Sequence, residues 1–304
     1  MYEQNTDIHG ANLLAVCLSL QLCVLKNLSV MHAAVRSIAV YFGAPHQSVY
    51  SALFTVLFVL TVILLSFLLP MLLFFRLRHK KITCYIRLRP ELPLYPFFTI
   101  IFTAAAAVLT LLFIDTVAET GHLLTPLRVR IPEGAFEITF FFICRVLIPA
   151  LAIEILFRGI VLNELMPWGR TFAIAAAAFT GALLSDSPSM FLFQAVIGLI
   201  SGYFVCHTNS LWMGVFISLV SNLIYFLDCF LYSTALSMQY GALIEITVAV
   251  LFVAGIFSCI KIDEQIRSNK IHPIPYDRNQ HSVFQCLLAP CAVAYYIIIL
   301  INIG

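Results

Sequence analysis

The sequence predicts an all-α protein: a polytopic transmembrane helical bundle of about eight spanning helices that follows an N-terminal apolar or interfacial helix. Of its 304 residues, 62% are apolar and 11% are charged, and the mean hydropathy is +0.99. Soluble domains carry roughly 25% charged residues. Several apolar runs reach the ~20 residues that a bilayer crossing requires. Because these runs are continuous rather than short and alternating, the pattern excludes a transmembrane β-barrel.

The first apolar stretch covers residues 11–42 and is interrupted by Lys26, His32 and Arg36. It fits either a spanning helix with a basic flank or an interfacial helix, and the sequence leaves both open. The segment Gly43-Ala44-Pro45 ends it.

The region before this stretch holds acidic residues and no basic n-region, so we expect no cleaved signal peptide. We therefore expect two regions, an N-terminal apolar or interfacial helix in residues 1–49 and a membrane-embedded bundle in residues 50–304.

The spanning helices of the bundle follow from its apolar runs. We expect them at residues 50–75, 97–116, 135–165, 171–185, 189–206, 210–232, 238–260 and 283–303. Pro149 interrupts the third run. Because proline cannot donate to the carbonyl of Arg145, we expect a kink at that point.

Basic residues gather in two segments, residues 76–90 and a loop at residues 261–282. The positive-inside rule places both segments in the cytoplasm, and the six spans between them agree with this. The alternative interpretation of the first segment is a patch that binds lipid headgroups or a partner. A net charge of +2 excludes a nucleic-acid-binding surface. Membrane lipids are the expected partner, and the chain is expected to be a multi-pass protein of the cell membrane.

The nine cysteines show neither C-x-x-C pairs nor the spacing of a metal site. Most lie in apolar runs, where a thiol behaves as a small hydrophobic side chain. Glu245 is a lone acid in the expected span at 238–260 and could mark an ion path.

Glu154 and Arg158 lie four residues apart in an otherwise apolar helix and therefore share one helix face. Charge at this depth in a bilayer costs several kcal/mol unless it is paired or functional. The pair is part of an active site or an architectural ion pair that holds helices together. The physical chemistry of these residues alone leaves both possibilities open.

The segment from Ile153 to Gly159 resembles the E-E-x-x-x-R-G signature of the CPBP family, the CAAX proteases and bacteriocin-processing enzymes also called Abi proteins. The resemblance extends over about residues 140–225, with the spacing of four further segments kept. These are Gly169-Arg170-Thr171, Phe191 to Gly202, Thr208-Asn209-Ser210-Leu211-Trp212, and Ile217 to Asn222. The resemblance implies a bacterial intramembrane protease fold.

Three positions depart from the family pattern. The resemblance implies a water-activating glutamate where the chain has Ile153, and histidines where it has Ser185 and Ser218. The positions Glu154, Arg158 and Asn222 match, and these six are the motif positions of the chain. Relatives are expected to use a divalent metal such as zinc, whose sites need about three His or acidic ligands.

We therefore expect no catalytic residue, no cofactor and no metal in this chain. We expect positions 153, 185 and 218 to surround one cavity, with no base within hydrogen-bond reach. Ser185 and Ser218 are interpreted as hydrogen-bonding groups between helices. A less favoured alternative is a rearranged serine hydrolase in which Asp186 assists Ser185.

These departures favour a catalytically silent CAAX-protease-like protein that binds or scaffolds a hydrophobic peptide or a membrane protein. Its role would lie in bacteriocin immunity, peptide export or complex assembly. Two alternatives stay open. One is an active intramembrane endopeptidase with an atypical site. The other is a transporter or channel component that uses Glu245 and the Glu154–Arg158 pair in a polar path.

Overall fold

The structure is a computed structural model. It describes residues 2–41, 52–78, 95–120, 134–185, 187–233 and 236–268, together with isolated positions at 124, 127–129, 131 and 297. Apart from short turns, these ranges are helical, and no strand occurs among the described residues. The expected all-α class is confirmed.

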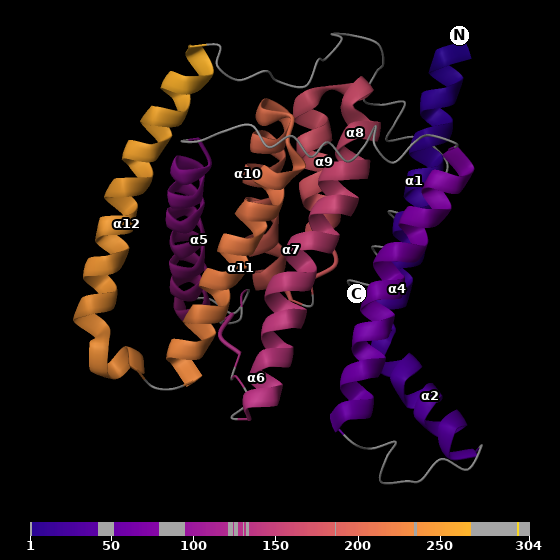
Figure 1. The fold of residues 1–304 in the computed structure, drawn as a ribbon, viewed down its shortest axis with the longest axis horizontal. Helices are drawn as coiled ribbons and strands as arrows, with labels where there is room; N and C mark the ends of the chain where they lie inside the picture. The colour runs from indigo at the N-terminus through magenta and orange to yellow at the C-terminus, as the bar shows by residue number, and fades with distance from the viewer. Residues whose placement is uncertain are drawn as a thin grey trace. The chain divides into compact units, whose positions relative to one another are not determined.

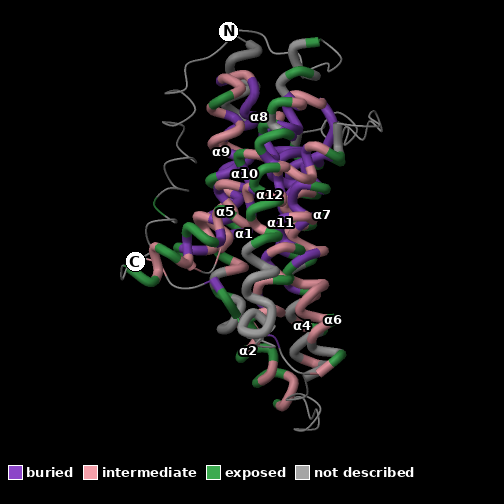
Figure 2. Tube along the Cα trace, turned by 90° about the vertical axis from the view of Figure 1, so that its left-hand side faces the viewer, coloured by how far each residue is buried: buried purple, intermediate pink, exposed green. Residues whose placement is uncertain are grey.

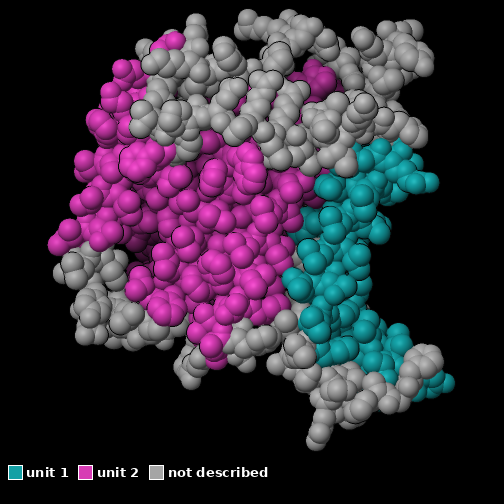
Figure 3. Space-filling model, viewed as in Figure 1, with its two compact units in different colours: residues 1–82, 279–304 teal, residues 83–278 magenta. Residues whose placement is uncertain are grey.

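The chain divides into two compact units (Figure 3). Unit 1 comprises residues 1–82 and 279–304, and unit 2 comprises residues 83–278. The boundary expected at residues 49 and 50 stays a prediction.

Unit 1 contains α1 (Tyr2–Lys26), α2 (Leu28–Tyr41) and α4 (Ala52–Arg78). Both α1 and α2 pack against α4 (Figure 1). The stretch at 11–42 is two helices rather than one, because the chain turns at Asn27, whose side-chain amide donates to the carbonyl of Cys23 at 2.8 Å. The backbone amide of Asn27 donates to the same carbonyl at 3.3 Å, so Asn27 contacts it through both of its amide groups.

Unit 2 is a bundle in which α12 lies along α5, and α10 packs between α9 and α11 (Figure 1). Its elements are α5 (Tyr95–Thr120), α6 (Ala135–Phe142), η2 (Ile143–Leu147), α7 (Ile148–Ile153), η3 (Glu154–Val161), α8 (Leu162–Leu165), η4 (Met166–Trp168), α9 (Arg170–Ala182), α10 (Pro188–Thr208), α11 (Leu211–Ser233) and α12 (Leu236–Arg267). The buried residues concentrate where α7 to α11 meet (Figure 2).

Several helices are long and apolar enough to cross a bilayer, which confirms a helical membrane protein. In the described part of the chain there are five such segments: Leu60–Leu77, Phe97–Thr120, Ile138–Trp168, Pro188–Thr208 and Leu211–Tyr232. Shorter apolar helices cover Gly10–Leu25 and Ile246–Ile262. The span expected at 283–303 lies outside the described residues. The span expected at 171–185 corresponds to α9, whose 13 residues are shorter than a full crossing needs.

The long helical run from Ala135 to Trp168 departs from α-helical hydrogen bonding just before Pro149, the residue at which a kink was predicted. Before Pro149 the helix widens into the π-helical segment η2, where the Ile148 amide donates to the carbonyl of Ile143, five residues back. Proline removes the donor that the Arg145 carbonyl would use in an α-helix, and a π-helical segment accommodates such a loss. A second π-helical segment, η3, carries the Glu154–Arg158 pair.

Two connections depart from the sequence-based expectations. The loop expected at 261–282 is wrong at its start, because α12 continues through Arg267. The side chain of Ile262 is buried, and Lys261 pairs with Glu264 at 2.8 Å, so both an apolar contact and an ion pair three residues apart support the helix. The expected helix at 171–185 ends earlier, at Ala182, which leaves Ser185 in the turn before α10.

The turns that flank α9 and α10 explain how these helices begin and end. Gly169 has a φ of 122°, a conformation that side-chain-bearing residues rarely adopt, and it directly precedes α9. Ser187 caps α10, because its hydroxyl accepts a hydrogen bond from the Met190 amide at 3.2 Å. Asn209 ends α10 in the left-handed region with a φ of 52°.

One end of the bundle is tied together by Arg128. Its guanidinium contacts Asp115 of α5 at 2.9 Å and Asp228 of α11 at 3.4 Å. Beside it, the Tyr225 hydroxyl donates to the carbonyl of Leu127 at 3.2 Å. The buried side chain of Leu127 adds an apolar contact, so this connecting segment is fixed to both helices.

Candidate functional site

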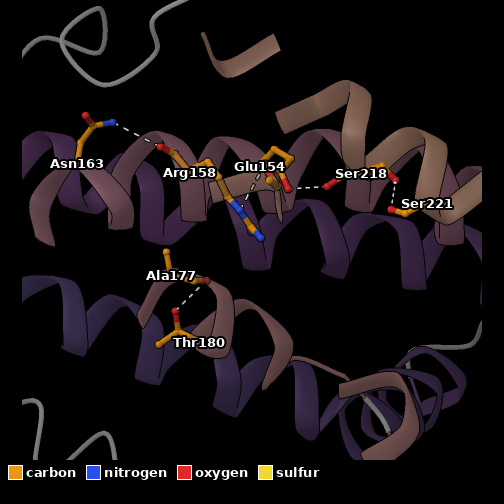
Figure 4. A network of polar contacts seen from close by, with 8 residues as sticks. Glu154, Arg158, Asn163, Ala177, Thr180, Ser218 and Ser221 are labelled. Carbon is orange, nitrogen blue, oxygen red and sulfur yellow. Dashed lines mark hydrogen bonds and ion pairs between the residues drawn. The ribbon is translucent and has the colours of Figure 1, made fainter. Parts of the chain in front are cut away.

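The carboxylate of Glu154 lies at the centre of the bundle with a side-chain exposure of 0%. It begins η3 and points toward α10 and α11 (Figure 4). The surrounding apolar sequence buries this face of the helix against both neighbours, so the acid cannot reach water at the surface. A buried carboxylate is costly unless hydrogen bonds and an opposite charge stabilise it.

Two serine hydroxyls from different helices supply these hydrogen bonds. The Ser218 hydroxyl of α11 donates to Glu154 Oε1 at 2.5 Å, and the Ser201 hydroxyl of α10 donates to Glu154 Oε2 at 2.6 Å. Hydrogen bonds to an ionised acceptor are short and strong compared with neutral ones. The carboxylate therefore connects three helical segments of the bundle.

Arg158 supplies the opposite charge from the next turn of η3. Its Nε lies 3.5 Å from Glu154 Oε2, and its side chain is 3% exposed. The guanidinium lies between α9 and α10, where Gly181, Gly198 and Ala178 provide room for it. The two side chains share one helix face and form an ion pair, as the spacing predicted. Whether the pair belongs to an active site or only holds helices together stays a prediction.

Glycines let the helices approach the ion pair closely. A Cβ added to Gly214 of α11 would collide with Glu154 Oε2, and one added to Gly198 would lie 2.6 Å from Arg158 Nη2. Gly202 faces Ile174 of α9, so the Gly198-x-x-x-Gly202 motif packs within the bundle.

A polar series continues from Ser218 along α11. The Ser221 hydroxyl donates to the Ser218 carbonyl at 3.1 Å. Asn222 is buried, and its Oδ1 accepts a hydrogen bond from Gln194 of α10 at 3.4 Å. The matching motif position Asn222 thus joins α10 to α11.

Asn163 stabilises the point where η3 returns to α-helix. The Leu162 amide donates to the Phe157 carbonyl, five residues back, so the Arg158 carbonyl loses the donor that an α-helix would supply. The Asn163 side-chain amide lies 2.6 Å from the Gly159 carbonyl and 3.4 Å from the Arg158 carbonyl (Figure 4). We conclude that Asn163 compensates for the altered hydrogen bonding of the π-helical segment.

The three positions that depart from the family pattern, 153, 185 and 218, lie in different surroundings. Ile153 ends α7 with a partly buried side chain, and Ser218 contacts the buried acid. Ser185 is partly exposed in its turn. Its backbone amide donates to the carbonyl of Ala182 at 3.0 Å, which continues the turn after α9. The expectation that no base lies within reach is wrong for Ser218, because the Glu154 carboxylate accepts its hydrogen bond.

Two residues of the site were not predicted from the sequence. Ser201 and Gly214 both contact Glu154 Oε2, the serine through its hydroxyl and the glycine through its lack of a side chain. The sequence feature that could have indicated Ser201 is a hydroxyl within an apolar helix, one residue before Gly202. Nothing in the local sequence distinguishes Gly214 from other small residues.

Glu245, singled out as a lone acid, falls within α12, but its side chain lies outside the described residues. Asp186, considered as a partner of Ser185, also lies outside them.

Comparison with known proteins identifies the segment that carries this site. Residues 135–224 match the family model described as type II CAAX prenyl endopeptidase Rce1-like. A search of curated proteins finds no match, and neither does a search of solved structures. The match contains Glu154, Arg158, Ser201, Ser218 and Asn222, the residues that meet in the centre of the bundle. Residues 135–224 of this membrane protein therefore form an Rce1-like domain of the CPBP family.

Proposed function

We propose that this chain is a catalytically silent relative of the CAAX prenyl endopeptidases, which binds a hydrophobic peptide or another membrane protein without cleaving it. One observation carries the proposal: both carboxylate oxygens of Glu154 are already engaged inside the bundle, by Ser218, Ser201 and Arg158. The acid acts as a structural acceptor.

Hydrolysis of a peptide bond by an activated water requires a base that can reach that water. Glu154 is fully buried, and serine hydroxyls occupy both of its oxygens. Its chain neighbour Ile153, at the position of the family's leading acid, carries no group that accepts a proton. Neither residue is therefore placed to activate a water molecule, which supports binding without cleavage.

The residues at this position do not fit a divalent metal. Zinc sites combine three or so His, Cys or carboxylate ligands. Around Glu154 the remaining polar groups are hydroxyls and a guanidinium, and a guanidinium repels a cation. In the part of the chain that the structure describes, no three His, Cys, Asp or Glu side chains lie close enough together to share a metal ion.

The matched family supports the binding part of the proposal. Its description names a prenyl endopeptidase that acts on CAAX peptides, so its fold holds a peptide with a long apolar substituent. A bundle that keeps this fold without the base retains the capacity to hold such a ligand. We propose the cell membrane as its location and complex assembly, peptide export or bacteriocin immunity as the setting.

A second candidate is an active endopeptidase with an atypical site. The hydrogen bond between Ser218 and Glu154 favours it. Ser218 donates to a carboxylate at 2.5 Å, and a carboxylate can accept a proton from a nucleophilic serine. The contacts of Arg158 and Ser201 with Glu154 Oε2 oppose this role, because they already hold the carboxylate in place within the bundle.

Incubation of the purified, lipid-reconstituted chain with a farnesylated CAAX peptide tests both candidates. Binding is followed with a fluorescent peptide, and cleavage is followed by mass spectrometry. A matched set of variants is Ser218→Ala, which removes the hydroxyl of the site, and Ser258→Ala, which removes a buried hydroxyl bonded within its own helix.

The proposal predicts saturable binding and an intact peptide for the wild type and the Ser258→Ala variant. Cleavage by the wild type that disappears only in Ser218→Ala would establish the second candidate instead. A peptide that neither binds nor is cleaved would contradict both.

A further inference from the structure

The short helix α2 presents an apolar face that no described helix covers. Met31, Ala34, Val35, Ile38 and Tyr41 follow the three- and four-residue spacing of one helix face. Val35 is 38% exposed, Ile38 is 55% exposed and Tyr41 is 84% exposed. The spacing of about 100° per residue places Arg36 on the opposite side of the helix.

The contacts of α2 with α4 fix which side faces the protein. The ring of His32 lies 4.8 Å from the ring of Phe58 and 6.2 Å from that of Phe54. His32 and Arg36 are four residues apart and share this side of α2. The apolar face therefore points away from α4.

The same contacts give the level of α2 along α4. Phe54 and Phe58 lie in the first two turns of α4, which is apolar from its first residue, Ala52, and contains the membrane-crossing segment Leu60–Leu77. The start of a spanning segment lies at the boundary between the headgroups and the acyl chains. Since α2 packs beside this start, it lies at the level of that boundary.

The length of α2 excludes a crossing of its own. Its 14 residues extend about 21 Å at ~1.5 Å per residue, whereas the hydrocarbon core measures ~30 Å. The break at Asn27 separates it from α1. A short helix with an apolar face, placed at the end of a span, has the geometry of a helix that lies in the membrane surface.

We propose that α2 is an interfacial helix whose apolar face, Met31, Ala34, Val35, Ile38 and Tyr41, inserts into the boundary between lipid headgroups and acyl chains. Tyr41 then takes the position that tyrosines favour at membrane interfaces. This surface is separate from the Glu154 site, so the inference does not depend on the proposed function.

Fluorescence quenching of the full chain tests the inference in vesicles of phosphatidylcholine and phosphatidylglycerol. An environment-sensitive coumaryl amino acid replaces Ile38 in one variant and Ser37 in the other. Ser37 is the matched control, because it is exposed in the same helix and lies about 100° around the helix axis from Ile38. Quenchers are lipids with a doxyl group on the acyl chain and iodide present on both sides of the membrane.

We expect doxyl lipids to quench the reporter at position 38 several-fold more strongly than the one at position 37, and iodide to show the reverse order. Equal quenching of both positions by iodide would overturn the proposal, because the face would then be in water. A reporter at position 38 that neither quencher reaches would also overturn it, because protein would then cover the face. Unfolding temperatures in detergent verify that both variants are folded. If the Ile38 variant is unstable, Val35 and Ala33 provide a second matched pair.

Discussion

The hydroxyl of Ser218 donates to Glu154 Oε1 at 2.5 Å, across 64 positions of the sequence, and so joins α11 to η3. With Ser201 bonded to the other oxygen, the carboxylate is shared among three helical segments. Glu154 thus joins η3 to α10 and α11.

Removal of either serine hydroxyl is expected to destabilise the bundle. Ser218→Ala and Ser201→Ala should each lower the free energy of unfolding by about 1–2 kcal/mol. Net values reach ~1.5–3 kcal/mol for hydrogen bonds to charged groups, while bonds between membrane helices average ~0.6 kcal/mol. Thermal unfolding in detergent measures the effect. Ser258→Ala, whose hydroxyl bonds to Ala254 within α12, should change stability much less. Equal losses in all three variants would argue against a special role for the Glu154 contacts.

Loss of both members of the ion pair should cost less than the sum of the two single losses. Arg158→Leu leaves a buried carboxylate without its countercharge, and we expect a cost of about 3–5 kcal/mol. The double variant Glu154→Leu with Arg158→Leu should cost less than the sum of the two single changes. Unfolding in denaturant gives the coupling energy between the two positions. As a control, Lys261→Ala breaks a largely exposed pair and should cost about 0–1 kcal/mol. Simple additivity at 154 and 158 would contradict the pairing.

Glycine substitutions report on the close approach of the helices to the ion pair. Gly214→Ala would place a methyl group against Glu154 Oε2, and we expect a loss of about 1–3 kcal/mol from overpacking. At Gly181 an added Cβ would meet its nearest atoms at 3.4 Å, an ordinary contact distance. Gly181→Ala should therefore leave stability unchanged or raise it by up to about 1 kcal/mol, since alanine favours helix. Melting temperatures of both variants test the difference, and a reversed order would show that the packing around Glu154 is looser than described.

Asn163→Leu should weaken the second π-helical segment, because it removes the amide that donates to the Gly159 carbonyl at 2.6 Å. The same amide lies 3.4 Å from the Arg158 carbonyl, which has lost its α-helical donor. An unsatisfied buried carbonyl costs about 1–3 kcal/mol, and we expect a loss in that range. Hydrogen exchange over residues 154–165 should rise together with this loss. Thr180→Val provides the control, since it removes a hydroxyl that bonds within its own helix α9. Unchanged exchange in Asn163→Leu would mean that backbone contacts alone hold η3.

Local patterns predicted the parts of the fold and site that depend on neighbours in the chain. The four-residue spacing of Glu154 and Arg158 was enough to place both on one face. Pro149 indicated where the helix departs from regular hydrogen bonding, while the kink expected there stays a prediction. The match of residues 135–224 to the family model agrees with the segment of about 140–225 that the motif spacing indicated.

Contacts between distant segments could not be predicted in this way. The bond from Ser201 to Glu154 joins residues 47 positions apart, and it depends on how α10 packs against η3. The end of α12 was misplaced for a related reason. The charged residues that begin at Lys261 led to the prediction of a loop. In the structure Lys261 pairs with Glu264 along one helix, and Ile262 is buried.

Turnover of a farnesylated CAAX peptide by the purified chain in lipid, measured beside the Glu154→Gln variant, tests the account most directly. If Glu154 serves only as an acceptor for Ser201 and Ser218, both proteins should leave the peptide intact over prolonged incubation. Cleavage by the wild type that is lost on Glu154→Gln would contradict the account, because it would show that this carboxylate takes part in hydrolysis.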